Sequence, residues 1–193
     1  MMNTICLVRH GETDANKNYI VQGRIDNPLN DNGRRQAKAT GNYLARNHEL
    51  FDVYITSPLK RAFETARIIA SELDQTKPIF ANCDLVERNF GSYDGHKIDE
   101  NYSKLILSGE IPDMEKNHEL EDRVMNALKE ICAKHPNRNI LIVAHSHVIK
   151  ALLVQLLPGF TYISYLANCS LNYLSFEDGV FTVLKHNVNP LDI

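Results

Sequence analysis

The chain has 193 residues, 44% of them hydrophobic and 23% charged, a composition typical of a soluble globular protein with one well-filled core. Its formal net charge of -3 and pI near 6.2 argue against a nucleic-acid-binding protein, whose basic face would raise both values. No apolar run approaches the roughly 20 residues of a membrane helix, and the N-terminus lacks a signal-peptide pattern, so we expect a cytoplasmic protein that binds neither nucleic acid nor membrane.

The first predicted element is a buried strand, because the apolar run 5–8 ends abruptly at Arg9 and His10. Residues 15–32 then form a predicted loop, since they are rich in Asn, Asp and Gly. A loop of this length in a compact domain is usually functional.

Two helices and two strands are predicted in the next part of the chain. Apolar residues at helical spacing indicate helices over 34–48 and about 59–73, and β-branched and aromatic residues indicate strands over 51–56 and 78–81. Arg61 falls in the first turn of the second helix, where partial positive charge disfavours a cation. Either a site that collects positive charge for an anion or a solvated surface position accounts for this arginine.

A structured loop and a weakly patterned segment follow. Residues 84–95 combine glycines, aromatic residues and charges, including Glu87, which indicates a folded loop rather than a linker. Residues 96–118 show only a short helical pattern, at about 101–107. We interpret 96–118 as a lid or insertion within a single domain of residues 1–193.

The clearest pattern lies near the C-terminus. An amphipathic helix is predicted over about 120–135, followed by a continuous apolar strand over 139–144, a form typical of strands covered by helices on both faces. His145 follows that strand directly. Ser146 is expected to be the N-cap of a further helix that extends to residue 157.

A hairpin of two strands, over about 170–176 and 180–186, completes the predicted fold. Alternating strands and helices with this hairpin indicate a three-layer α/β/α domain with a mostly parallel mixed sheet and an antiparallel edge. Ligands bind beyond the carboxyl ends of the parallel strands in such sheets. The strands that end at Val8 and Ala144 each bring a histidine to that edge.

These residue types suit a phosphate monoester. Arg9 and Arg61 each offer a planar fork of donors to phosphate oxygens. A histidine that is largely unprotonated at neutral pH can attack phosphorus and carry a phosphoryl group without a metal. Glu87 is the best-placed acid to protonate the leaving alkoxide, because flanking phosphate oxygens would raise its pKa toward the working range.

The motifs resemble those of the histidine phosphatase superfamily, in its phosphoglycerate-mutase-like branch, over essentially the whole chain. The motifs that carry the resemblance are Leu-Val-Arg-His-Gly-Glu-Thr at 7–13 with Asn16, Gln22-Gly23-Arg24, Ser57-Pro58-Leu59-Lys60-Arg61-Ala62, Glu87 with Gly91 and Gly95, and Val143-Ala144-His145. Together they are specific, whereas an isolated Arg-His-Gly would be weak.

The resemblance implies a role for each matching residue. His10 would be the phosphorylated nucleophile, Glu87 the proton donor, and Arg9, Arg61 and His145 the phosphate ligands. Residues expected to contact phosphate or substrate are Thr13, Asn16, Gln22, Gly23, Ser57 and Ser146. No cofactor and no metal are implied.

One position departs from the family pattern, which usually has glycine after the second histidine. Ser146 stands there instead, and it keeps the backbone N–H for an anion. We therefore expect the site to tolerate it. His145 and His147 together also suggest a metal pair, although residues i and i+2 share a face only on a strand, whereas a helix is predicted to begin here.

Three functions fit these motifs. The first is a metal-independent phosphatase of small phosphate monoesters, and the second is a cofactor-dependent phosphoglycerate mutase, which returns the phosphoryl group to another substrate hydroxyl. The segment 95–119 contains no arginine, whereas mutases of this kind bring extra arginines there, so the phosphatase is favoured. The third is a non-catalytic phospholigand-binding protein, which would need a distorted site.

Substrate choice is expected to lie in the segment 97–118 and in rim residues such as Tyr19, Ile25, Phe90 and Tyr93. The expected partner is a small phosphate ester, and the oligomeric state stays open, with a homodimer as one option. The four cysteines lie far apart with no CxxC pair, which indicates buried free thiols in a reducing compartment. They are Cys6, Cys83, Cys132 and Cys169.

Overall fold

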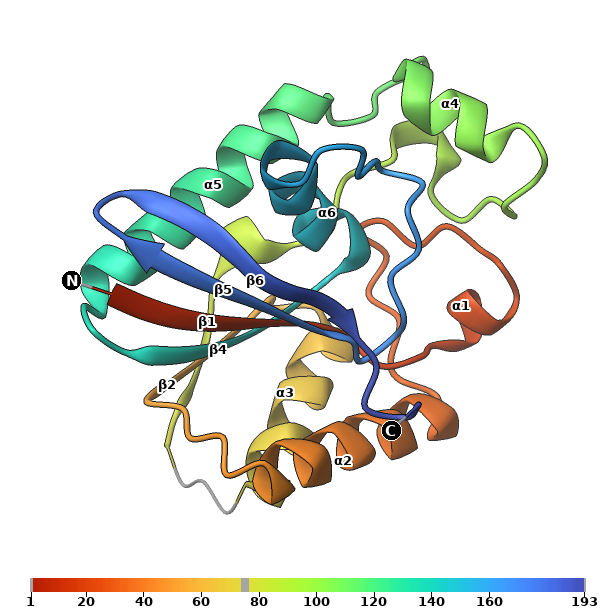
Figure 1. Ribbon diagram of the computed structural model, residues 1–193. Coiled ribbons are helices and arrows are strands. Elements are labelled where there is room, and N and C mark those ends of the chain that lie inside the picture. Colours follow the sequence, from red (N-terminus) through yellow and green to blue (C-terminus); the bar gives the residue numbers. More distant parts are fainter. Residues whose placement is uncertain (1, 74–76, 193) are drawn as a thin grey trace.

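A computed structural model describes residues 2–73 and 77–192. Its centre is a mixed six-stranded sheet in the order β3-β2-β4-β1-β5-β6 (Figure 1). The strands are β1 (Met2–Arg9), β2 (Val53–Thr56), β3 (Ile79–Ala81), β4 (Asn139–Ala144), β5 (Leu171–Glu177) and β6 (Val180–Val188). The first four run parallel, and β5 and β6 form the antiparallel edge, which confirms the predicted α/β class with its mostly parallel sheet.

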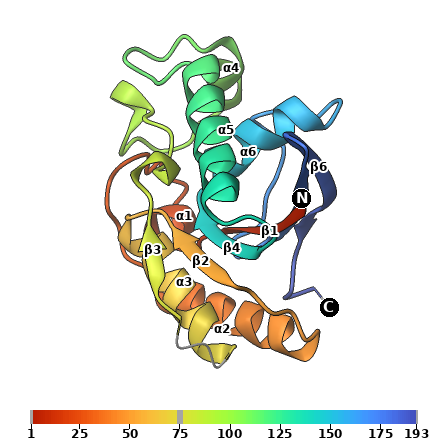
Figure 2. The same ribbon diagram turned by 90° about the vertical axis from the view of Figure 1, so that its left-hand side faces the viewer.

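Helices cover both faces of the sheet. The pair α2 (Asp31–Arg46) and α3 (Lys60–Glu72) lies on one side, and α5 (Asn117–Lys134) and α6 (Ser146–Leu156) lie on the other (Figure 2). Side chains of β1 alternate between the two layers because successive residues of a strand point to opposite faces. Cys6 and Val8 belong to the core on the α2–α3 side, whereas Ile5 and Leu7 belong to the core on the α5–α6 side.

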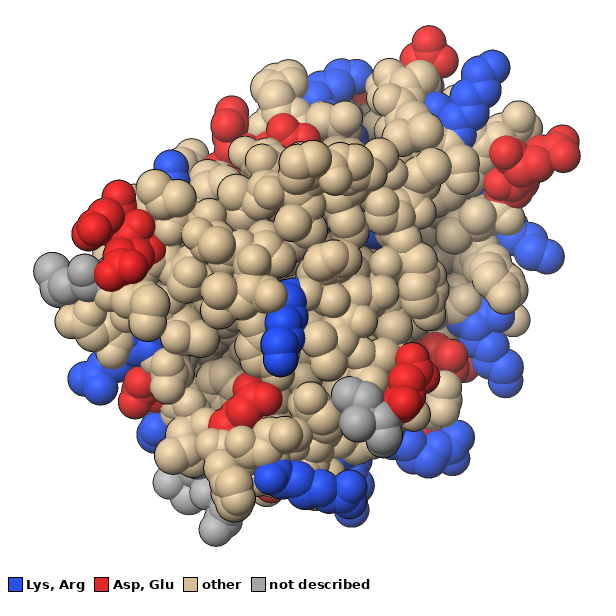
Figure 3. Space-filling view, in the orientation of Figure 1, with Lys and Arg blue, Asp and Glu red and all other residues tan. Residues whose placement is uncertain are grey.

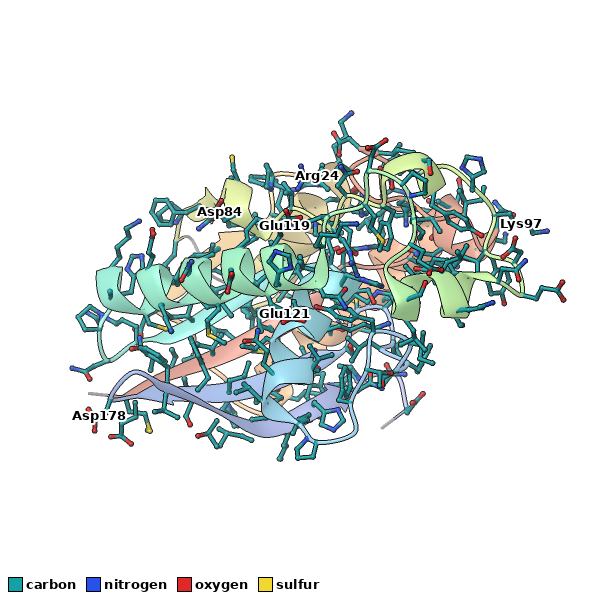
Figure 4. The ribbon with its side chains drawn as sticks, turned by 90° about the horizontal axis from the view of Figure 1, so that it is seen from above. Arg24, Asp84, Lys97, Glu119, Glu121 and Asp178 are labelled. Atoms are coloured by element: carbon teal, nitrogen blue, oxygen red, sulfur yellow. The ribbon has the colours of Figure 1, made fainter. Side chains whose placement is uncertain are left out.

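The remaining short elements surround the carboxyl ends of the parallel strands. They are α1 (Asp14–Lys17), the 3-10 turns η1 (Cys83–Leu85) and η2 (Gly91–Tyr93), and α4 (Tyr102–Ser108). The turn between β5 and β6, marked by Asp178, lies at the end of the molecule opposite Lys97 (Figure 4). Among the described residues, no helix is long and apolar enough to cross a membrane.

Two local predictions are wrong. The expected loop over 15–32 begins with the single turn α1, because Thr13 caps it by accepting a hydrogen bond from the Asn16 backbone. Ser146 is not the N-cap of α6 but its first residue, and His145 is the N-cap without a side-chain capping bond. A carboxylate from another loop replaces the cap, since Glu87 accepts from the His147 backbone N–H and so satisfies an amide that the helix start leaves free.

The cysteine prediction holds in part. All four thiols are free, and Cys6, Cys132 and Cys169 are buried, but Cys83 is exposed. Cys83 opens the turn η1 instead of packing under a helix, which the isolated sequence position did not reveal.

Candidate active site

The two histidines of the site are neighbours because their strands are neighbours. Arg9 of β1 pairs with Ala144 of β4 in the sheet register, so His10 and His145 follow side by side. The His10 backbone N–H donates to the Ala144 carbonyl at 3.0 Å, and the two imidazole centroids are 5.2 Å apart. Both side chains are buried.

Hydrogen bonds fix the protonation of the His10 ring. Its Nδ1 lies 2.7 Å from the Gly11 carbonyl oxygen, which can only accept, so Nδ1 carries the proton. Nε2 then presents its lone pair, and the Nε–H of Arg61 donates to it at 3.3 Å. Burial, with Arg61 and Arg9 nearby, holds the pKa of His10 well below its usual range, so the imidazole is neutral and nucleophilic at pH 7.

Arg61 is buried in the first turn of α3, with 1% of its surface exposed, which excludes the solvated alternative. Its Nη1 donates to the Ile25 carbonyl at 2.7 Å and its Nη2 to the Gly23 carbonyl at 2.8 Å. Burial lowers its pKa to about 10, so it stays charged at neutral pH. The guanidinium is therefore oriented by neutral acceptors, which leaves its charge free to bind an anion.

Arg9 is held in the same way, because its Nη1 donates to the Leu166 carbonyl. Its Nε is buried with no hydrogen-bond partner among the described residues. An unsatisfied guanidinium nitrogen beside His10 is costly unless a ligand supplies an acceptor. The arrangement therefore favours an oxyanion in front of the nucleophile.

Glu87 lies buried at the start of α6. Its Oε1 accepts from the Arg88 backbone at 2.9 Å and from the His147 backbone at 3.2 Å. Burial is the main cause that raises the pKa of its carboxyl, against these hydrogen bonds and the nearby arginines. A carboxyl with a raised pKa in a cavity beside a nucleophile is suited to general acid catalysis.

A cavity of about 250 Å³ joins most of the predicted site residues. Those that line it are Arg9, His10, Asn16, Gln22, Gly23, Arg61, Glu87 and Ser146. The cavity thus brings together residues from five separate parts of the sequence.

Thr13, Ser57 and His145 do not line the cavity but lie behind residues that do. Thr13 donates from Oγ1 to the Gln22 side-chain oxygen at 2.9 Å, and His145 Nε2 lies 2.7 Å from Ser57 Oγ. Thr13 therefore orients Gln22, and His145, held by Ser57, packs its ring against that of His10.

His147 is buried in the wall of the cavity. Its ring stacks on Tyr162 at 5.2 Å and meets Phe90 edge-on at 4.8 Å. His145 and His147 thus have separate surroundings. In the ranges 2–73 and 77–192, no group of three or more His, Cys, Asp or Glu side chains is arranged to hold a metal ion.

Several lining residues were not predicted as site residues. Ile98 and Tyr102 come from the segment 97–118, as expected for that segment, whereas Tyr19, Ile25 and Tyr93 do not line the cavity. The missed residues are Ile20, Val21, Lys150, Ile163, Ser164, Tyr165 and Leu166. Residues 163–166 carry no motif, but Lys150 lies one helical turn after Ser146, a spacing that places both on one face of α6.

Comparisons with known proteins agree with this geometry. The family model described as "Histidine phosphatase superfamily (branch 1)" matches residues 5–189. The Bacillus subtilis (strain 168) protein named "Uncharacterized phosphatase PhoE" is 38% identical over 190 residues, which cover 97% of this chain and 96% of that protein. The "Metal-independent phosphoserine phosphatase" of Arabidopsis thaliana is 35% identical, over 90% of this chain and 76% of that protein.

A solved structure is similar over nearly its whole length. Phosphoserine phosphatase from Entamoeba histolytica, in complex with 3-phosphoglyceric acid, superimposes with a TM-score of 0.80 and 29% identity, over 96% of each chain. Relatives named 2,3-bisphosphoglycerate-dependent phosphoglycerate mutase are also found, at 31%, 30% and 32% identity.

Proposed function

Because the chain belongs to branch 1 of the histidine phosphatase superfamily and is a phosphatase enzyme, we propose that it hydrolyses small phosphate monoesters at His10. The observation that carries this proposal is the unprotonated Nε2 of His10, which accepts a hydrogen bond from Arg61 in a cavity that Arg9 and Glu87 also line. The cavity of about 250 Å³ suits a small ester, since pockets for drug-sized ligands are typically 300–1,000 Å³.

In the first step, His10 Nε2 attacks phosphorus and a P–N bond forms as the ester P–O bond breaks. Arg9 and Arg61 bind the phosphate oxygens, where negative charge persists through the transition state. The leaving alkoxide takes the proton of the Glu87 carboxyl and departs as an alcohol. The Nδ1–H bond to the Gly11 carbonyl keeps the ring in the attacking tautomer throughout.

In the second step, water attacks the phosphoryl group and the P–N bond breaks. Glu87, now a carboxylate, takes a proton from that water, so the carboxyl is restored together with neutral His10. Inorganic phosphate leaves. His145 acts in this proposal as a phosphate ligand once substrate is bound, in exchange for its resting contact with Ser57.

A phosphatase is favoured over a mutase by the residues around the cavity. A mutase must hold the dephosphorylated substrate for return of the phosphoryl group, and the segment 95–119 offers no arginine for that purpose. The relatives named for phosphoserine and the neighbour solved with 3-phosphoglyceric acid support small phosphorylated metabolites as candidate substrates. The segment 96–118, with Ile98 and Tyr102 at the cavity, serves in this proposal as a lid.

The test is the His10→Ala variant, assayed with p-nitrophenyl phosphate in excess EDTA. We expect the unchanged protein to turn over under these conditions, because arginines supply the positive charge that a metal would otherwise provide, and we expect the variant to lose turnover. Undiminished hydrolysis by His10→Ala would overturn the nucleophile assignment. Activity that vanished in EDTA and returned with zinc or magnesium would favour a metal site at His145 and His147 instead.

A further inference from the structure

Lys150 is a buried cation that the phosphoryl chemistry does not use. It lies on α6 with 8% of its surface exposed, and it lines the cavity. Its Nζ donates to the Tyr162 carbonyl at 2.7 Å. An ammonium group has three donors, so this bond leaves two of them for another acceptor.

The surroundings of Lys150 lack a resident counter-charge. In the part of the chain that the structure describes, no carboxylate lies within ion-pair distance of Nζ. Burial lowers the pKa of Lys150, the charge of Arg9 acts in the same direction, and Glu87 is the acidic group that opposes them at longer range. Burying an ammonium group without an anion is costly, and that cost falls when an anionic ligand enters the cavity.

The position of Lys150 on α6 defines where that anion would lie. Ser146 and Lys150 both line the cavity and are four residues apart on α6, about 6 Å along the helix axis. The phosphate end is fixed at His10 and the two arginines. A ligand that extends along α6 from this end reaches Lys150 after a short carbon chain.

Apolar side chains also line the cavity, among them Phe90, Ile163 and Leu166. Because Lys150 is itself buried, an anion would meet its ammonium group largely out of contact with bulk water. Electrostatic attraction is stronger there than in water. A carboxylate at this point would therefore contribute strongly to the choice of substrate.

We propose that Lys150 is a specificity-determining residue that binds the carboxylate of phosphate esters of short hydroxy acids. The proposal rests on the proposed function, since it places the phosphate at His10.

The experiment compares two esters that differ only in the carboxylate, O-phosphoserine and O-phosphoethanolamine. The readout is the ratio of their kcat/KM values in the full-length protein. We expect the unchanged protein to prefer O-phosphoserine, and Lys150→Met to reduce the ratio by about 10- to 100-fold, the loss typical of a hydrogen bond to a charged group. The loss should fall mainly on KM, and Lys150→Arg should retain most of the preference. Lys129→Met, at an exposed lysine of α5, is the matched control and should leave the ratio unchanged.

Two results would overturn the proposal. One is an unchanged protein without preference for O-phosphoserine. The other is a Lys150→Met variant that slows hydrolysis of both esters equally. Loss of the hydrogen bond to the Tyr162 carbonyl alone would have that effect. If Lys150→Met fails to fold by circular dichroism, Lys150→Gln gives a second neutral variant. Parallel assays with p-nitrophenyl phosphate and His10→Ala separate these outcomes from failure of the phosphatase assignment itself.

Discussion

At the scale of the residue, the site depends on proton positions that hydrogen bonds set before substrate arrives. His10 is a neutral nucleophile because its Nδ1 faces a carbonyl and its Nε2 faces a guanidinium. Burial is the main cause that raises the pKa of Glu87 and so favours its protonated form. The pKa of His10 is lowered and that of Glu87 is raised, so the two shifts favour an unprotonated nucleophile and a protonated acid.

The Glu87→Gln variant tests the acid role. It should slow alkyl phosphates by about 10²- to 10⁴-fold, because their alkoxides require a proton on departure. It should slow p-nitrophenyl phosphate far less, since p-nitrophenolate leaves without one. The measurement is kcat/KM for both classes of ester, and equal slowing of the two classes would remove the acid role from Glu87.

Much of this chemistry was predictable from local sequence, and some was not. Arg9 ends β1 and His10 follows it directly, so the strand pattern alone places them at the sheet edge. Lys150 was missed because its significance depends on the fold of residues 158–166, whose carbonyl at Tyr162 holds it. The capping role of Glu87 at α6 was likewise hidden, because the two are far apart in sequence.

At the scale of the element, the first motif is held by the start of α2. A Cβ on Gly33 would lie 2.1 Å from the Glu12 carbonyl oxygen, and one on Gly11 would lie 2.5 Å from the Gly33 carbonyl oxygen. The Asn30 side chain also donates to Glu12 Oε1 at 2.9 Å. The loop after His10 therefore packs against the start of α2 with main-chain atoms of both in direct contact.

The Gly33→Ala variant tests this contact. Alanine normally stabilises a helix by about 1 kcal/mol relative to glycine, but here the clash with backbone should reverse the sign. We expect the free energy of unfolding to fall by about 1–3 kcal/mol, with a lower kcat as the loop moves. Urea denaturation measures this, with Arg35→Ala on the exposed side of α2 as control. A Gly33→Ala variant more stable than the parent would show that the loop and the helix can move apart at little cost in free energy.

The helices and strands themselves were largely predictable, because their apolar periodicity matches the faces that they bury. The strand over 139–144 has the same bounds in the structure, since its continuous apolar run is covered on both sides. The single turn α1 was missed because four residues are too few to show a helical period, and only the spacing of Thr13 and Asn16 signals it.

At the scale of the whole molecule, charge is distributed unevenly between surface and interior. The net charge is -3, and on the face shown in Figure 3 Lys and Arg lie mainly along the rim, interspersed with Asp and Glu. The cavity of the site instead carries more positive than negative charge. Arg9, Arg61 and Lys150 line the cavity, against the single carboxyl of Glu87.

This interior makes the fold sensitive to acid. Burial holds the pKa values of His10, His145 and His147 well below 6.5, so each binds a proton on unfolding once the pH is below about 6.5. Each should lower the free energy of unfolding by about 1.4 kcal/mol per pH unit as the pH falls from there. Glu87, whose pKa is raised, acts in the opposite direction and loses its contribution as the pH rises.

Urea denaturation at pH 7.5, 6.5 and 5.5 measures the effect, with His147→Phe as the comparison, because phenylalanine keeps a ring against Tyr162 and Phe90 but does not titrate. We expect the parent to lose stability toward pH 5.5 and the variant to lose about 1.4 kcal/mol less per pH unit. If the free energy of unfolding depended on pH equally in the parent and the variant, His147 would take up no proton on unfolding.

The cations of the site share one more property: apart from the bond of Arg61 Nε to His10 Nε2, their hydrogen-bond acceptors belong to the main chain. Arg61 is held by the carbonyls of Gly23 and Ile25, Arg9 by that of Leu166, and Lys150 by that of Tyr162. Every amino acid supplies a carbonyl, so these bonds survive substitution of the side chains that carry them. During divergence, exposed side chains at the cavity such as Ile163 and Tyr165 can therefore change, and with them the organic part of the substrate, while the phosphate-binding arginines keep their orientation. Gly23 is an exception, because a Cβ there would lie 1.9 Å from Asp94 Oδ1.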